Sequence, residues 1–286
     1  MQRSPRSGKA GIYVVLALLA VGTVLAVLAK SHRASRSPEP SLPPAAVQPA
    51  APTPPAAPPP EAPQATAILK GRVLFTGAEI PVRKQMDVTK DKEACECDVR
   101  DGARKPTKLD ESLVVDAGSK GIANAVVWVK GMRGGAKRLE AVVDQHACQF
   151  VPHVALLTPG GKVTLLNPDQ ISHNYSAHAQ VPGNPSQNLS ISKMRKQASY
   201  PEQGSFAKPE FVHVTCDIHP WMAMWVAVVD SGFAVVSDEK GQFSIPGLPP
   251  GPYTLGVWHE TLAKEPIERA VTLGPEGGEI QVSLGP

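Results

Sequence analysis

Three side chains that can bind a soft metal ion lie within seven positions of one another, in the sequence Cys216-Asp-Ile-His219-Pro-Trp-Met222. A fourth candidate, His173, lies upstream in the sequence SHN. A thiolate, two imidazoles and a thioether are the ligand set of a type-1 copper site, where two His and one Cys form a plane and Met is a long axial ligand. Thiolate and thioether favour Cu(I), and imidazole also accommodates Cu(II). The spacing therefore predicts one copper ion that can change its oxidation state.

The strand before Cys216 supports a buried thiolate. In FVHVTC, alternation places Val212, Val214 and Cys216 on one face of a strand and His213 on the other. The aliphatic face should point inward, so Cys216 continues a buried row into the following turn. His213 points away from Cys216, and we exclude it from the predicted site.

The elements that must position these residues are short strands. Runs rich in Val, Ile and Leu, such as ILKGRVLF, ANAVVWVKG, FVHVTC and YTLGVWHE, are separated by Gly, Pro and Asp turns. This pattern predicts an all-β protein built as an antiparallel sandwich or barrel. Two polar stretches, residues 82–107 and 181–208, read as loops or insertions.

The N-terminus predicts an export device over residues 1–36. Residues 11–29 form an uncharged apolar run of about the length that crosses a bilayer, flanked by Lys and Arg on both sides. The run is either a retained transmembrane helix or a cleaved signal peptide, and its length favours the anchor. Residues 37–65 are rich in Pro and Ala and predict a semi-extended linker. Either alternative places the folded part outside the cytoplasm, in a periplasm or at a cell surface.

The composition excludes several function classes. A net charge of +3 over 286 residues gives no indication of nucleic-acid binding. We find no motif for a hydrolytic triad or a phosphate-binding loop, and therefore expect a protein that is not an enzyme.

The segments GGKVTLLNPDQISHN and VHVTCDIHPWM resemble those of cupredoxins, the blue copper proteins such as amicyanin and plastocyanin. The resemblance covers about residues 150–230 and implies a Greek-key sandwich. It places the copper ligands on His173, Cys216, His219 and Met222, and assigns to Asn174 the role of tying the two ligand loops together. It also implies that His219 faces solvent and passes electrons. Met224 stays open as an alternative axial ligand.

A second resemblance concerns the flanking segments. FAVVSDEKGQFSIPGLPPGPYTLGVWHE is similar to the carboxypeptidase regulatory-like, transthyretin-type sandwich, and LKGRVLFTG and IANAVVWVKG resemble its opening strands. We therefore divide the folded part into residues 66–140 and 231–286, which form one regulatory-like sandwich, and an inserted cupredoxin domain, residues 141–230. The alternative is a single enlarged sandwich.

The remaining cysteines allow a disulfide in an exported protein. If Cys216 binds copper, then Cys95, Cys97 and Cys148 remain. The simplest hypothesis joins one of the first two to Cys148. We take Cys97–Cys148 as the possible pair while the choice stays open. The alternative is a second soft-metal site made of these three cysteines and His146.

Together the resemblances imply a membrane-tethered, extracytoplasmic one-electron carrier whose redox partner protein is unidentified. We expect that partner to dock on an apolar patch around His219, Pro220 and Trp221. Two alternatives remain: a structural or ligand-binding β-sandwich with a degenerate copper site, and a copper chaperone or store.

Overall fold

The computed structural model describes residues 66–97, 107–132, 138–200 and 206–286, which belong to one compact unit, 59–286. The predicted anchor (1–36) and the whole predicted linker (37–65) lie outside the described residues, and those predictions stay predictions. Within the described ranges no helix is long and apolar enough to span a bilayer.

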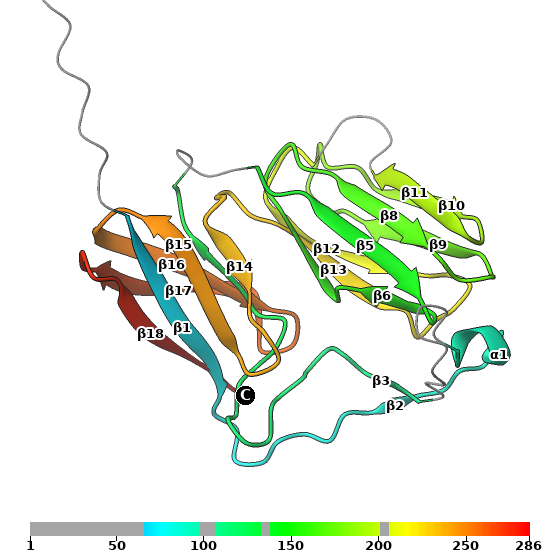
Figure 1. Ribbon diagram of the computed structural model, residues 1–286, viewed down its shortest axis with the longest axis horizontal. Coiled ribbons are helices and arrows are strands. Elements are labelled where there is room, and N and C mark those ends of the chain that lie inside the picture. Colours follow the sequence, from blue (N-terminus) through cyan, green and yellow to red (C-terminus); the bar gives the residue numbers. More distant parts are fainter. Residues whose placement is uncertain (1–65, 98–106, 133–137, 201–205) are drawn as a thin grey trace, which may run out of the picture. The chain divides into compact units, whose positions relative to one another are not determined.

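The regular secondary structure of the described residues is almost entirely β, which confirms the predicted all-β class (Figure 1). Most strand pairs are antiparallel, but β1–β18, β13–β7 and β5–β8 are parallel, which the prediction of an antiparallel sandwich did not include. The elements are β1 (Ala67–Phe75), β2 (Gln85–Met86), α1 (Lys92–Cys95), β3 (Lys108–Leu109), β4 (Val126–Val129), β5 (Ala141–His146), β6 (Gln149–Val151), β7 (Val154–Leu157), β8 (Val163–Asn167), β9 (His173–His178), β10 (Gln187–Ile191), β11 (Arg195–Tyr200), β12 (Glu210–Thr215), β13 (Ala223–Val228), β14 (Ala234–Val236), β15 (Gln242–Leu248), β16 (Gly251–His259), β17 (Ala263–Leu273) and β18 (Gly278–Leu284).

The central part of the chain forms two sheets, of strand order β10-β9-β12-β13-β7 and β11-β8-β5-β6. Apolar side chains alternate along these strands, as in β8, where every second residue is buried. The inward-facing residues of both sheets meet in one core that includes Phe150, Leu165, Tyr175, Val214 and Met224. This core extends to Cys216 and Met222, so two of the predicted ligands lie at its edge.

The flanking segments form two further sheets, of order β15-β1-β18 and β14-β4-β16-β17. Strands from both ends of the described chain pair here, because β1 lies between β15 and β18 and β4 lies between β14 and β16. Leu69, Phe243 and Val282 of the first sheet pack with Val127 and Leu255 of the second. Residues near both predicted ends of the flanking module therefore share one core.

Strand β4 is buried on both faces, and it connects the two pairs of sheets. In β4, Val127 and Val129 belong to the flanking core, whereas Val126 and Trp128 belong to a third cluster. That cluster also contains Val154 of β7 and Ala227 of β13. Gly256 is required beside it, because a Cβ there would lie 2.3 Å from the Trp128 ring.

Both segments predicted to be loops contain regular structure. Residues 82–107 include β2 and the short helix α1, and residues 181–208 include β10 and β11, so the second prediction was wrong. β10 and β11 are edge strands of their sheets, and in β10 only Ile191 is fully buried. An edge strand tolerates polar side chains, which is why the sequence here does not look like a core strand.

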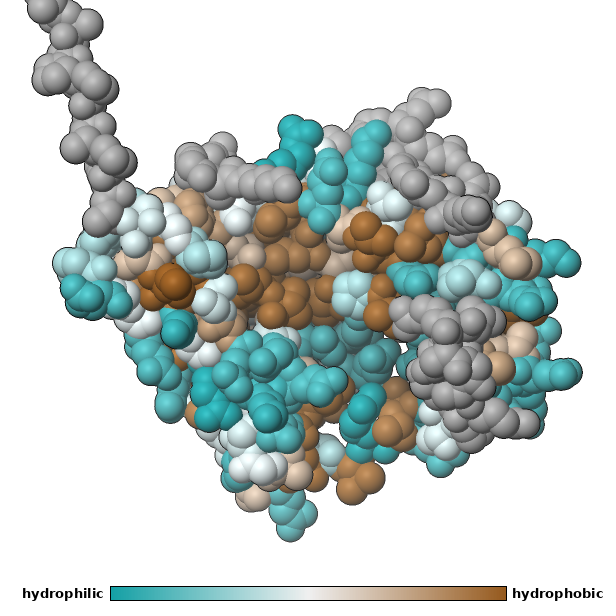
Figure 2. Space-filling view, in the orientation of Figure 1, coloured by the Kyte–Doolittle hydropathy of each residue, from teal (hydrophilic) through white to brown (hydrophobic). Residues whose placement is uncertain are grey.

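In Figure 2 hydrophobic side chains gather near the middle of the drawn face, with hydrophilic ones around them. The large apolar residues that are exposed, among those described, lie on separate elements and loops: Ile68, Val82, Leu109, Val142, Val151 and Met194.

Candidate metal centre

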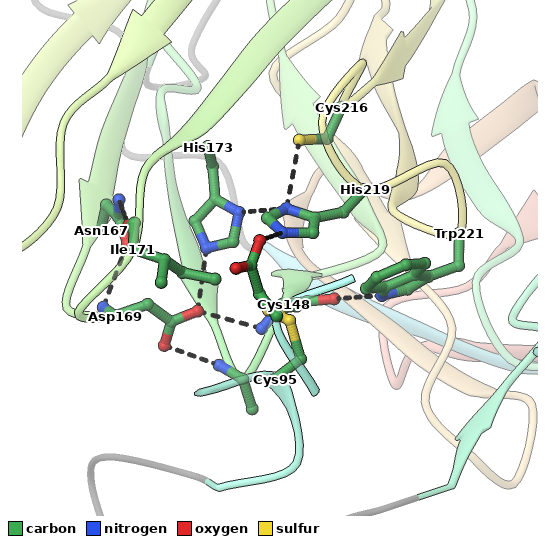
Figure 3. The surroundings of a disulfide bond; sticks show 11 residues. Cys95, Cys148, Asn167, Asp169, Ile171, His173, Cys216, His219 and Trp221 are labelled. Carbon is green, nitrogen blue, oxygen red and sulfur yellow. Dashed lines mark hydrogen bonds and ion pairs between the residues drawn. A yellow bond between two sulfur atoms is a disulfide. The ribbon is translucent and has the colours of Figure 1, made fainter. Parts of the chain in front are cut away.

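Three of the four predicted ligands meet in one buried place (Figure 3). The Nδ1 atoms of His173 and His219 are 2.9 Å apart, and Sγ of Cys216 is 3.7 Å from Nδ1 of His219. One ligand atom from each of the three residues lies within 4.8 Å of the other two. Both histidine side chains are completely buried and Cys216 is 1% exposed, so the donor atoms are shielded from water.

The local chain path explains this convergence. His173 is the first residue of β9, and Cys216 directly follows β12, its neighbour in the sheet. The turn after Cys216 is closed by its backbone N–H, which donates to the Met222 carbonyl at 3.1 Å. The Met222 N–H in turn donates to the His219 carbonyl at 2.9 Å. These bonds hold the imidazole of His219 over the thiol.

Asn174 connects the two ligand-bearing segments. Its Oδ1 accepts the Asp217 backbone N–H at 2.7 Å, and its Nδ2 donates to Oδ2 of Asp217 at 3.0 Å. Its own backbone N–H lies 3.5 Å from Sγ of Cys216. The residue therefore occupies the position that the cupredoxin resemblance implied for a side chain that ties the ligand loops together.

Asp169 fixes the first histidine, and sequence reasoning missed it. Its Oδ2 lies 2.9 Å from Nε2 of His173, and both side chains are buried. Asn167, the last residue of β8, shapes the connecting loop, because its Oδ1 accepts the Asp169 N–H and its Nδ2 reaches the Ile171 carbonyl. When the carboxylate accepts a hydrogen bond from Nε2–H, the proton of the neutral ring is on Nε2. The lone pair of Nδ1 of His173 is then available to a metal.

Asp91 has the same relation to the second histidine. Its Oδ2 lies 3.1 Å from Nε2 of His219, although the two residues are 128 positions apart. Asp91 immediately precedes α1 and its side chain is about half exposed, whereas that of His219 is buried. Both candidate histidine ligands thus have one nitrogen held by a carboxylate and the other directed at the thiol.

The site favours a charged sulfur. Burial opposes the thiolate, but hydrogen bonds with His173 and His219 outweigh it and lower the pKa of Cys216 to about 6. Burial also opposes charge on His173, yet its bonds to Asp169 and Cys216 raise the pKa of that imidazole. The surroundings therefore stabilise a thiolate, the form of cysteine that binds metals.

The expectation that His219 faces solvent is wrong, since its side chain is completely buried. The Trp221 ring lies 5.2 Å from the His219 ring, and its Nε1–H donates to the Cys148 carbonyl at 3.1 Å. Trp221 is thereby partly buried against the protein, and only Pro220 of the predicted docking patch is exposed.

The disulfide joins Cys95, not Cys97, to Cys148. Cys97 is partly buried and carries a free thiol. Cys95 is the inward-facing residue of α1 and is completely buried, which brings its sulfur to Cys148. The disulfide also overturns the alternative of a second soft-metal site with His146, because two of its thiols are consumed.

Met222 and Met224 both lie in the buried cluster that contains Cys216. Four other described histidines have contacts elsewhere. His178 contacts Oγ1 of Thr215 at the surface, and His213 is half-buried beside Trp225. His153 forms a buried ion pair with Glu260, and Nδ1 of His259 accepts two backbone N–H groups.

The donors present fit copper. Two imidazole nitrogens and a sulfur that favours the thiolate form face one another, and the buried Met222 ends the same turn as Cys216 and His219. This mixture of soft and borderline ligands suits copper, whereas Mg²⁺ and Ca²⁺ prefer sites made of oxygen ligands. His173, Cys216 and His219 would hold the ion, and Met222 is the candidate axial ligand.

Comparisons with known proteins identify copper proteins among the solved structures. No protein-family model and no curated protein sequence matches the chain. A Cu-containing nitrite reductase from Thermus scotoductus is 19% identical over 41% of this chain but only 25% of its own, with a TM-score of 0.28. Amicyanin from Paracoccus versutus is 17% identical over 36% of this chain and 96% of its own, with a TM-score of 0.27. A purple cupredoxin from Nitrosopumilus maritimus is 18% identical over 31% of this chain and 98% of its own, with a TM-score of 0.25.

Proposed function

We propose that this protein is a membrane-tethered, extracytoplasmic type-1 copper protein that carries single electrons. His173, Cys216 and His219 would hold its one copper ion, and Met222 would supply a thioether as the fourth ligand. The observation that carries the proposal is the convergence of two Nδ1 atoms and one thiol in a buried pocket. When bound, copper supplies the one-electron couple that protein side chains lack.

The chain's own residues preorganise this site. Asp169 and Asp91 hold Nε2 of the two imidazoles, which orients both rings and increases their basicity. Asn174 keeps the two ligand loops at a constant separation. A site that changes little between oxidation states exchanges electrons readily, and these bonds restrict its movement.

The same enclosure argues against a catalytic role. Four protein ligands leave no position for a substrate, whereas catalytic metal sites keep one open. The ligands are also buried, so a substrate would have no direct approach. We therefore propose a carrier and not an enzyme, with a redox protein as its partner.

The location outside the cytoplasm rests on two observations. The apolar run at residues 11–29 predicts export, and the Cys95–Cys148 disulfide is typical of an oxidising compartment. Tethering follows if the apolar run is retained as a membrane helix.

A copper store or chaperone is the second candidate. The complete burial of His219 favours it, because an enclosed ligand set retains metal well and exposes no ligand edge to a redox partner. Such a protein would bind Cu(I) tightly and would be oxidised and reduced slowly.

The test is a visible and EPR spectrum of the full-length protein in detergent after Cu(II) loading, compared with Cys216→Ser. We expect an intense thiolate-to-copper band, one copper per chain, and complete loss of the band in the variant. Rapid cycling with a small-molecule oxidant and reductant would support the carrier, and slow cycling with tight Cu(I) retention the store. A colourless protein would contradict the proposal and leave a structural β-sandwich.

A further inference from the structure

The second histidine is covered by a segment from outside the cupredoxin-like sheets. We call residues 88–97 the capping segment. Asp91 of this segment contacts Nε2 of His219, and a sulfur atom of each of Cys95 and Cys148 lies within 4.8 Å of a nitrogen of the same ring. The segment thus contacts the Nε2 edge of the imidazole, whereas Nδ1 lies 3.7 Å from Sγ of Cys216.

The capping segment is carried by an arm of the flanking sandwich. The chain leaves that sandwich after β1, at Phe75, and returns to it at Gly121, which bridges to Leu74. Along the arm, β2 pairs with β3, and Nε of Arg83 donates to the Asp110 carbonyl at 2.8 Å. The described parts of the arm, residues 76–97 and 107–120, therefore have structure of their own, and the first of them brings the capping segment to the ligand end of the central sheets.

The segment is anchored on the central core at two points. Val88 and Cys95 are buried in the same cluster as Cys216 and Met222. Cys95 is bonded to Cys148, and its N–H donates to the Asp91 carbonyl at 2.9 Å. The disulfide thus holds the turn that presents the Asp91 carboxylate.

The other end of the disulfide is held by the second carboxylate. Ala147 and Cys148 connect β5 to β6 with φ values of 49° and 53°, a left-handed conformation that residues with a Cβ seldom adopt. Both backbone N–H groups donate to Asp169, at 2.9 and 3.0 Å. The Cys95–Cys148 bond therefore links the capping segment, whose Asp91 contacts His219, to the β5–β6 turn. That turn is held by Asp169, which contacts His173.

We propose that the capping segment is an integral part of the metal site, that Asp91 is a positioning residue for His219, and that the Cys95–Cys148 disulfide keeps the site closed. This inference rests on the proposed function. Asp91 accepts Nε2–H of His219 and so keeps Nδ1 directed at Cys216. With the capping segment in place, the ligands are closed to solvent and to competing chelators. Without it, the same ligands would be accessible from the His219 side.

The first experiment needs no metal. In a Cys97→Ser background, Cys216 is the only free thiol, so its modification by a maleimide reports how closed the pocket is. We expect Asp91→Ala to increase the modification rate about tenfold, and the double substitution of Cys95 and Cys148 by Ser to increase it at least as much. Asp91→Asn, which keeps a hydrogen-bond acceptor, should stay within about twofold of the parent. Glu93→Gln removes a carboxylate from the exposed side of the same helix and should have no effect.

The second experiment loads copper and measures its transfer to a Cu(I) chelator. We expect Asp91→Ala to release copper about 10- to 100-fold faster, the range in which outer carboxylates act on metal sites, with substantial recovery in Asp91→Asn. Circular dichroism melting checks that each variant is folded.

Equal modification and release rates in the parent and Asp91→Ala would overturn the inference even if the parent shows the thiolate-to-copper band. If the parent never binds copper but Cys216 is still modified faster in Asp91→Ala than in the parent, the result would support the cap and reject the proposed function.

Discussion

Asp91 and His219 are 128 positions apart, yet Oδ2 of Asp91 lies 3.1 Å from Nε2 of His219. The contact joins an arm of the flanking sandwich to the turn after β12. Both parts of the fold therefore contribute to the predicted copper site: the central sheets carry the candidate ligands, and the arm carries the segment that covers His219. Asp169, by contrast, binds His173 from within the same loop, four positions away.

Asp169→Asn should weaken copper binding about 10- to 100-fold, because Asp169 uses both of its oxygens as acceptors for Ala147, Cys148 and His173, and an amide has only one. The change should also destabilise the metal-free protein, since Asp169 accepts the N–H groups of Ala147 and Cys148. Competition with a chelator of known affinity measures the first effect and thermal melting the second.

Asp238→Asn is the matched control, because this carboxylate also accepts two backbone N–H groups, from Lys240 and Gln242, but in a turn of the flanking sandwich. It should lower the melting temperature without changing copper affinity. Equal copper affinity in Asp169→Asn and the parent would show that Asp169 has no role in orienting His173.

Asn174→Ala should destabilise the metal-free protein by about 2 kcal/mol. The substitution leaves the backbone N–H of Asp217 without its acceptor in a partly buried place. Chemical denaturation of the copper-free chain measures the loss. Asn188→Ala removes the exposed neighbour that accepts from Nδ2 of Asn174, and should cost less than half as much. Similar losses in both variants would mean that Asn174 does not connect the ligand loops.

Met222→Leu should change the visible spectrum and raise the reduction potential, whereas Met224→Leu should change neither appreciably. Met222 ends the turn that is bonded to both Cys216 and His219. Met224 lies farther along β13, opposite Val214. Visible spectra and voltammetry of the two copper-loaded variants measure both effects. A changed spectrum and potential in Met224→Leu but not in Met222→Leu would make Met224 the axial ligand.

Much of the site could be predicted because its signals are local. Cys216, His219 and Met222 share one turn, and strand alternation already placed Cys216 on the inward face. Asp169 could have been found by the same reasoning, because it lies in the short loop before His173. The disulfide partner required the knowledge that α1 is a helix, since only then does Cys95 face inward.

Asp91 could not be predicted, because nothing in the sequence near it indicates which distant ring it meets. The exposure of His219 was mispredicted for the same reason, since the family resemblance covers only residues 150–230 and the cover comes from the arm. The edge strands β10 and β11 were missed because polar side chains are tolerated where one side of a strand has no neighbour.

Deletion of residues 231–286 should unfold the N-terminal strands. β1 pairs only with β15 and β18, and β4 only with β14 and β16, among the described residues. Limited proteolysis with mass spectrometry should therefore find new cleavage within residues 67–75 and 126–129. Continued protection of β1 would favour a division of the chain in which that strand belongs to the central part. The boundaries at 140/141 and 230/231 stay predictions until this is done.

The buried pair of His153 and Glu260 should make stability depend on pH. Burial disfavours the charged forms, but the bond between them raises the pKa of His153 and lowers that of Glu260. The stabilisation from His153 is complete below its unfolded pKa of about 6.5 and is lost as the pH rises through the raised value. The stabilisation from Glu260 is complete above its ordinary pKa of 4.5 and is lost as the pH falls through the lowered pKa.

The difference in melting temperature between the parent and Glu260→Gln should therefore be widest between about pH 4.5 and 6.5 and should narrow steadily above pH 6.5. The exposed Glu265→Gln is the control, with a small and constant gap. A gap for Glu260→Gln that does not change from acid to alkaline pH would mean that the two residues are not coupled as an ion pair.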